Sequence, residues 1–285
     1  MQYVAVVTDT IACLTREHIQ RYRIRVVPAK FSVNGHEYRD SVDISSSEAY
    51  RLLEEDPEYF ATSAASPTEI LEAFREASNT ARHILCITVS SRLSAQHDMA
   101  QLALELARQE LPQTSAQLLD SRNAAAAEGL ITLAAARAAA EGKSPAEVVS
   151  AAQDVIGRIR FFAVLETMRY VHRTGRVPRF AVRTGSALNV RPILTCSDGV
   201  IRFAGVARTK QRGLNRIVQT MRNQVGDSPV YVAVMHADAP DEAESLKQRV
   251  ASEFNCSELW VSEFSPLMGY ATGRGLLGLT FYVEG

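Results

Sequence analysis

The chain has 285 residues, of which 46% are hydrophobic and 22% charged, a balance typical of a globular protein with a substantial core. Its 31 Lys and Arg residues are balanced by 32 Asp and Glu residues, for a formal net charge of −1. Nucleic-acid partners normally require a basic surplus or stripe, and anionic membranes require a polybasic patch, so neither partner is predicted.

The N-terminal segment lacks the features of a targeting signal. It has no basic start, and its apolar run breaks at Thr8-Asp9, too early for a signal peptide. No stretch approaches the roughly 20 apolar residues of a membrane span, so stable membrane insertion is not predicted. The four cysteines show no C-x-x-C spacing and are typical of reduced thiols, which favours a cytoplasmic location; they are Cys13, Cys86, Cys196 and Cys256.

The first half of the chain alternates short β-branched runs with helical patterns. This order predicts a parallel sheet with crossover helices. A small hairpin over 31–38 is expected to turn at Asn34-Gly35. The predicted strands are 4–7, 24–27, 83–89 and 116–119, and the predicted helices are 15–22, 47–55, 67–78, 93–110 and the Ala-rich 124–140.

The composition changes after Lys143-Ser144-Pro145, and one more helix is predicted to about residue 156. The pattern beyond it favours a mixed or antiparallel sheet with helices. We therefore predict an α/β protein of two domains, a Rossmann-like domain over 1–158 and a second α/β domain over 159–285. The predicted strands of the second domain are 159–165, 200–206, 230–235, 259–264 and 277–283, and its helices are 209–225 and 241–254.

Polar residues follow the predicted strands of the first domain at Thr8-Asp9-Thr10, 88–94 and Asp120-Ser121. In open α/β sheets, ligands bind outside the carboxyl ends of the strands. These loops are therefore predicted to face a ligand.

Two glycine motifs fail as nucleotide sites. Gly142-Lys143-Ser144 resembles the end of a phosphate loop, but Arg137 stands where the first glycine belongs. The run Gly273-x-Gly275-x-x-Gly278 matches a dinucleotide fingerprint but precedes a strand at the end of the sequence, so its glycines are predicted to mark tight turns or close backbone approach. The six histidines have no metal-ligand spacing, and no cofactor or metal is predicted.

Several short motifs, taken in order along the whole chain, resemble the DegV family. They are Val7-Thr8-Asp9-Thr10, Thr62-Ser63-Ala64-Ala65-Ser66-Pro67, Ser90-Ser91-Arg92-Leu93-Ser94, Leu165-Glu166-Thr167 through Arg173-Thr174-Gly175-Arg176-Val177 with the following 188–194, Ala207-Arg208-Thr209-Lys210, and the glycine-rich 269–278.

The resemblance implies a two-domain α/β fold with a long-chain fatty acid bound between the domains. It also implies a non-catalytic role, as the lipid-binding subunit of a bacterial fatty acid kinase that presents the carboxylate to a separate kinase subunit. The chemistry is consistent, because each buried methylene contributes about 0.8 kcal/mol and a buried carboxylate then needs hydrogen-bond donors.

The resemblance also assigns residues. Thr62 and Ser94 match the two carboxylate-binding hydroxyls, and both are expected just before helices. Arg208 matches an arginine near the ligand head, and Ser63 is an additional candidate. The ordinary alternatives are a helix N-cap for Ser94, a turn hydroxyl for Thr62 and a surface ion pair for Arg208.

Several positions depart from the family pattern. Thr62-Ser63-Ala64-Ala65-Ser66 replaces Thr-Ser-Gln-Pro-Ser. Ser94-Ala95-Gln96 replaces Ser-Gly-Thr, Ala271 replaces a histidine beside the ligand head, and Arg274 replaces a proline. The missing histidine weakens the case for a kinase partner more than that for the fold. Arg274 is predicted to reach toward the ligand head or its portal, because a guanidinium there would restore positive charge. The ordinary alternative is an exposed arginine on a glycine loop.

Two other functions remain open at this point. The chain could be a lipid-sensing interaction module for another acyl ligand. It could also be an acyl-processing enzyme that uses Ser94 or Asp9, although His97, three residues from Ser94 on the same predicted helix, is poorly placed as its base.

Overall fold

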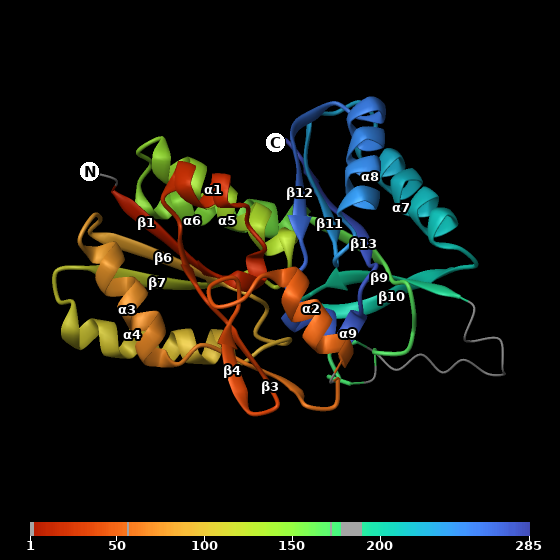
Figure 1. Ribbon diagram of the computed structural model, residues 1–285. Helices are drawn as coiled ribbons and strands as arrows, with labels where there is room; N and C mark the ends of the chain where they lie inside the picture. The colour runs from red at the N-terminus through yellow and green to blue at the C-terminus, as the bar shows by residue number, and fades with distance from the viewer. Residues whose placement is uncertain (1–2, 56, 172, 178–189) are drawn as a thin grey trace.

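The computed structural model describes residues 3–55, 57–171, 173–177 and 190–285, and its described part contains three β-sheets with helices around them (Figure 1). The first sheet is entirely parallel, with strand order β2-β1-β6-β7. All six residues of its central strand β1 are buried, as a strand covered on both faces requires. The strands are β1 (Val4–Asp9), β2 (Arg25–Val27), β6 (His83–Thr88) and β7 (Ser115–Asp120).

Helices cover both faces of this sheet. On one face lie α5 (Ala126–Ala140) and α6 (Pro145–Arg158), with α1 (Arg16–Tyr22) packed against α5 (Figure 1). On the other face lie α3 (Pro67–Ser78) and α4 (Gln96–Glu110). The predicted parallel sheet with crossover helices is confirmed.

The second sheet is mixed, with strand order β10-β9-β8-β13-β11-β12. Its only parallel pair in the described chain is β11 with β12. Helices α7 (Lys210–Val225) and α8 (Pro240–Glu253) cover its outer face (Figure 1). Its strands are β8 (Arg160–Val164), β9 (Arg191–Ser197), β10 (Val200–Ala207), β11 (Val230–His236), β12 (Cys256–Glu263) and β13 (Leu277–Val283).

The Ala-rich helix α5 joins the two sheets. It packs on β1 and β6 of the parallel sheet and on β11 and β13 of the mixed sheet, so it is apolar on nearly every side. Gly129 permits a close approach, since a Cβ there would come within 2.5 Å of the Ala12 carbonyl oxygen in the short helix η1 (Thr10–Ala12). In the sequence, the strands of the parallel sheet precede residue 158 and the described strands of the mixed sheet follow it. The division into two domains at that residue stays a prediction.

A third, antiparallel sheet with strand order β4-β3-β5 extends beside the first. Strands β3 (Lys30–Val33) and β4 (His36–Arg39) form the predicted hairpin at Asn34-Gly35. Strand β5 (Phe60–Ser63) pairs with the other edge of β3. Helix α2 (Ser46–Glu55) packs against α9 (Pro266–Thr272) close by.

The sequence patterns did not predict β5, β9 or α9, and α4 starts at Gln96 rather than at Leu93. The residues before α4 form a turn instead, in which the backbone N–H groups of Leu93 and Ser94 donate to the Ser90 carbonyl oxygen. The glycine run lies between α9 and β13, where Gly273 and Gly275 have φ values of 78° and 77°, which agrees with tight turns.

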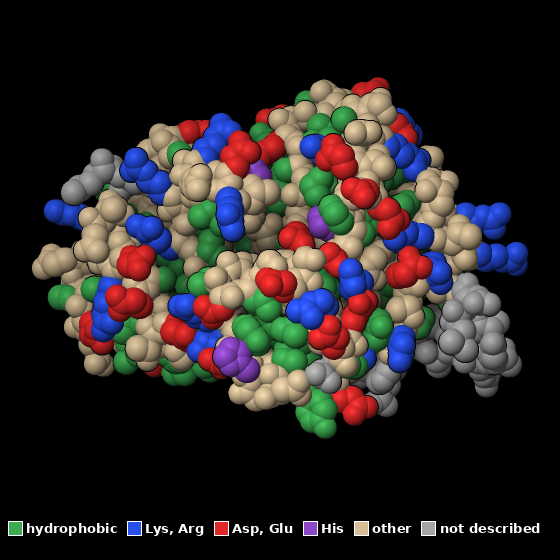
Figure 2. Space-filling model, viewed as in Figure 1, with side chains coloured by type: hydrophobic (Ala, Val, Ile, Leu, Met, Phe, Trp, Pro, Cys, Tyr) green, Lys and Arg blue, Asp and Glu red, His purple; other side chains and the backbone are tan. Residues whose placement is uncertain are grey.

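The surface seen in Figure 2 mixes acidic and basic side chains rather than presenting one sign of charge. This mixture agrees with the formal net charge of −1. No helix in the described ranges combines the length and hydropathy needed to cross a membrane.

Candidate functional site

A cavity of about 270 Å³ lies where the parallel sheet, the small antiparallel sheet and the mixed sheet meet. Residues that follow the carboxyl ends of β1 and β6 line one side of it, among them Ile11 and Val89. The cavity therefore lies at the edge of the parallel sheet where a ligand was predicted.

Most of the cavity wall is hydrocarbon. Before α5, the chain supplies a small cluster of Ile11, Ala29, Val89 and Ala124, against which Leu93, Leu267 and Met268 pack. The mixed sheet and the segments around it supply a second apolar part of the wall. Its members are Phe161, Ala163, Val177, Leu194, Ile201, Phe264, Ala271 and Leu276. Such a wall suits an acyl chain, whose burial is driven by the hydrophobic effect.

One region of the wall is polar. Thr62 and Ser63 at the end of β5, Ser94 and Gln96 at the start of α4, and Arg176 all line the cavity. Contacts bring these segments together, because Gln96 Oε1 accepts from Ala65 N at 3.0 Å and Arg176 Nε donates to the Leu93 carbonyl oxygen at 3.0 Å. Among the lining residues in the described chain, Arg176 alone is charged.

The polar region opens outward into a shallower hollow. Ser94 and Arg176 line both spaces, and Arg92 and Arg202 line only the outer one. The cavity thus has an apolar interior and a polar, positively charged mouth.

The two predicted hydroxyls occupy different local structures. Ser94 precedes α4, as expected; Ala95 is the N-cap residue, and Ser94 Oγ accepts from Gln96 N at 3.2 Å while Ser94 lines the cavity. Thr62 was also expected just before a helix, but it lies in β5, paired with Phe31. The expectation was wrong because Thr62 belongs to β5, and a loop separates this strand from α3.

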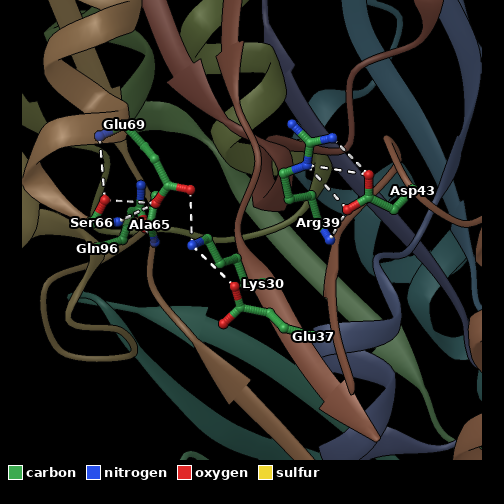
Figure 3. A network of polar contacts seen from close by, with 8 residues as sticks. All are labelled: Lys30, Glu37, Arg39, Asp43, Ala65, Ser66, Glu69 and Gln96. Atoms are coloured by element: carbon green, nitrogen blue, oxygen red, sulfur yellow. Dashed lines mark hydrogen bonds and ion pairs between the residues drawn. The ribbon is translucent and has the colours of Figure 1, made fainter. Parts of the chain in front are cut away.

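A polar network fixes the segment that carries Thr62 and Ser63 (Figure 3). Lys30 on β3 contacts Glu37 at 3.2 Å and Glu69 at 2.8 Å. Glu69 also completes a capping box with Ser66 at the start of α3. The loop between β5 and α3 is therefore tied to the hairpin, to α3 and, through Gln96, to α4.

The other predicted residues divide between the cavity and the surface. Ala271, on α9, is buried and lines the cavity. Arg208 is exposed just after β10, and Arg274 pairs with Glu54 at 2.6 Å and with Asp238. Neither arginine lines the cavity, and in the case of Arg274 the two carboxylates hold its guanidinium elsewhere.

Sequence reasoning gave no site role to Arg176 or Gln96. Arg176 lay within a quoted motif, and Gln96 was noted only as a departure from the family pattern. Their roles depend on contacts between distant segments, which neither position reveals by itself.

His97, the candidate base for an enzyme, instead has its Nδ1 2.9 Å from the Thr88 hydroxyl. No group of His, Cys, Asp or Glu in the described ranges is arranged to hold a metal ion.

A buried acidic pair underlies the cavity. Asp9 accepts from Ile11 N at 2.9 Å and from Val89 N at 3.1 Å, so it fixes two residues of the cavity wall. Glu128 on α5 is fully buried and accepts from the Thr8 hydroxyl at 3.2 Å. Burial raises the pKa of Asp9 to about 7 and raises the pKa of Glu128 well above its usual range.

This pair predicts a stability that falls with rising pH. An unfolded Asp titrates near pH ~4, so between about pH 4 and pH 7 folded Asp9 holds a proton that the unfolded chain has lost. Each such proton changes the free energy of unfolding by about 1.4 kcal/mol per pH unit. Urea unfolding of the wild type and of Asp9→Asn, each at several pH values in this range, should show a weaker decline in the variant, and equal slopes would refute the assignment.

Comparison with known proteins gives the chain a family. The model of the family described as "Uncharacterised protein, DegV family" matches residues 3–284. A DegV domain-containing protein of Caldanaerobacter subterraneus is 30% identical over 282 residues, covering 99% of each chain. Another, from Streptomyces coelicolor, is 31% identical over 281 residues, covering 98% of each.

Solved structures agree in fold. A fatty-acid-binding DegV family protein from Thermus thermophilus superposes with a TM-score of 0.89 at 27% identity, covering 99% of this chain and 100% of that one. DegV of Bacillus subtilis, also a fatty-acid-binding protein, superposes with a TM-score of 0.88 at 22% identity over 100% of both chains. The match of the family model and of these relatives along nearly the entire sequence shows that the chain belongs to the DegV family.

Proposed function

We propose that this protein binds one long-chain fatty acid, with the acyl chain in the cavity and the carboxylate at its polar mouth, between the two predicted domains. The observation that carries the proposal is the combination of a hydrocarbon wall with hydroxyls and a guanidinium that lines both the cavity and the outer hollow. The fatty-acid-binding protein of Thermus thermophilus, similar along the whole chain, supports it.

The mouth has unused donors for a carboxylate. The Ser94 Oγ accepts from Gln96 N, so its O–H remains free to donate. The Thr62 hydroxyl has no hydrogen-bond partner within the described chain. The Arg176 guanidinium adds a permanent positive charge. Donors of this kind offset the cost of removing a carboxylate from water.

Binding should be visible as a shift in thermal unfolding. A ligand that binds only the folded state, at 100 times its dissociation constant, stabilises that state by about 2.7 kcal/mol. Oleate or palmitate is therefore expected to raise Tm by several degrees, and a short-chain acid such as butyrate is expected to leave Tm unchanged. Equal Tm values with all three acids would contradict the proposal.

We further propose that the chain itself performs no chemistry on the lipid and presents the carboxylate to a separate kinase subunit. The carboxylate would sit at the opening of the cavity, where Arg92 and Arg202 line the outer hollow. A phosphoryl donor held by a partner could reach it there, and the arginines would attract the phosphate charge.

Restoring the histidine tests this role. The loaded protein, mixed with ATP and a bacterial fatty acid kinase catalytic subunit, is expected to yield acyl phosphate, and Ala271→His is expected to raise the yield while leaving fatty acid affinity intact. Ala271 is buried and lines the cavity, and the family pattern has a histidine beside the ligand head at this position, so an imidazole there would add a donor. Absence of acyl phosphate from both proteins would refute the kinase partnership but not fatty acid binding.

A further inference from the structure

Gln96 is a buried amide at the polar mouth of the cavity. It is the first residue of α4, and only 2% of it is exposed. Its side chain lines the cavity together with Thr62 and Ser94. Figure 3 shows it beside Ala65, whose backbone N–H donates to Gln96 Oε1 at 3.0 Å.

This contact fixes the orientation of the amide. The backbone N–H of Ala65 is a donor, so the Gln96 oxygen must face it and the Nε2 group must point away from it. Within the described chain, the two N–H groups of Nε2 have no hydrogen-bond partner. The residue is 2% exposed and lines the cavity, so a ligand in that cavity can supply the acceptor for these N–H groups.

Resting on the proposed fatty acid function, we propose that Gln96 Nε2 donates a hydrogen bond to the ligand carboxylate and so selects acids over neutral lipids of the same chain length. Ser94 and Gln96 are two residues apart on one turn, which allows both to contact one carboxylate. Ala271, on the same cavity wall, offers no polar side-chain atom. The amide therefore adds a donor to the hydroxyls of Thr62 and Ser94, where Ala271 adds none.

The variant Gln96→Glu isolates the donor. Its carboxylate can still accept from Ala65 N, so the tie to the loop before α3 is retained, but an oxygen replaces the donating nitrogen. Dissociation constants should be measured for palmitate and for hexadecanol, which has the same chain and no charge. Palmitate binding is expected to weaken roughly 10- to 100-fold at about pH 8, and hexadecanol binding to change less than about threefold.

The pH dependence gives a second, independent readout. Two adjacent carboxylates resist ionising together, so palmitate affinity of Gln96→Glu should improve from about pH 8 to about pH 6, relative to the wild type. The variant Gln96→Met, which lacks both the donor and the tie to Ala65, separates the two roles. It should weaken palmitate binding more than hexadecanol binding if the donor matters, and both equally if only the tie matters.

The outcomes distinguish the two proposals. Failure of the wild type to bind palmitate would overturn the proposed function itself. Tight wild-type binding with equal losses for palmitate and hexadecanol in both variants, or with no loss, would overturn only the role of Gln96. A loss confined to palmitate, together with the altered pH profile, would establish Gln96 as a residue that determines head-group specificity.

Discussion

Replacing Ala29 by phenylalanine is expected to weaken the binding of long-chain fatty acids about 100-fold and to shift the preference toward shorter acids. Ala29 is 3% exposed and lines the apolar interior beside Ile11, Val89 and Ala124. A ring at this position occupies space proposed for the acyl chain. If it displaces four methylenes, the lost burial is about 3 kcal/mol, since each methylene contributes about 0.8 kcal/mol.

The backbone at Ala29 need not change, because its N–H donates to the Thr10 hydroxyl at 3.1 Å and does not depend on the side chain. Added bulk in a packed region costs about 1–3 kcal/mol of stability, so Tm of the ligand-free variant must be recorded alongside affinity. Ala61→Phe is the matched control, since Ala61 lies on the exposed side of β5 and does not line the cavity. Titration with acids of increasing length should show a loss that grows with length in Ala29→Phe only; an unchanged length profile would refute the proposed path of the chain.

The double variant Thr62→Val, Ser94→Ala is expected to lose about 3–6 kcal/mol of binding free energy. Each hydroxyl is proposed to donate one charge-assisted hydrogen bond, which contributes about 1.5–3 kcal/mol. The apolar wall is unchanged in this variant, so the loss should appear for fatty acids and be small for fatty alcohols. Isothermal titration with both ligand classes measures the difference.

Loss of a local hydrogen bond complicates Ser94→Ala, because Ser94 Oγ also accepts from Gln96 N just before α4. Removing such a hydrogen bond costs about 1 kcal/mol of stability. Ser66→Ala supplies the control, since Ser66 caps the neighbouring helix α3 without lining the cavity. It should lower Tm and leave affinity unchanged, whereas an affinity loss equal to that of Ser94→Ala would attribute the effect to lost stability at a helix start alone.

Local patterns predicted most of the fold. Continuous apolar runs located the buried parallel strands, and the turn pair Asn34-Gly35 located the hairpin. The missed elements depend on distant partners. Strand β5 is four residues long and is held by pairing with β3, and α9 is a single short helix beside α2, so neither produces a clear period in the sequence.

The site was predicted less completely, for a physical reason. Hydroxyls such as Ser94 lie in short motifs that directly follow a strand at the edge of the cavity. Their position could therefore be predicted from the order of the elements along the chain. Charged side chains are long, and their positions in the folded protein depend on the partners that they find there. Arg274 is therefore held by Glu54 and Asp238. Arg176 is held at the cavity mouth by its hydrogen bond to the Leu93 carbonyl oxygen. Such pairings arise only when the chain has folded.

The most direct test of fatty acid binding is native mass spectrometry of the protein purified without added lipid. The proposal predicts a population heavier than the bare chain by the mass of one long-chain fatty acid, which denaturing extraction releases for identification. Delipidated protein should regain the same mass shift with added oleate. A spectrum that shows only the bare chain before and after oleate would contradict the account.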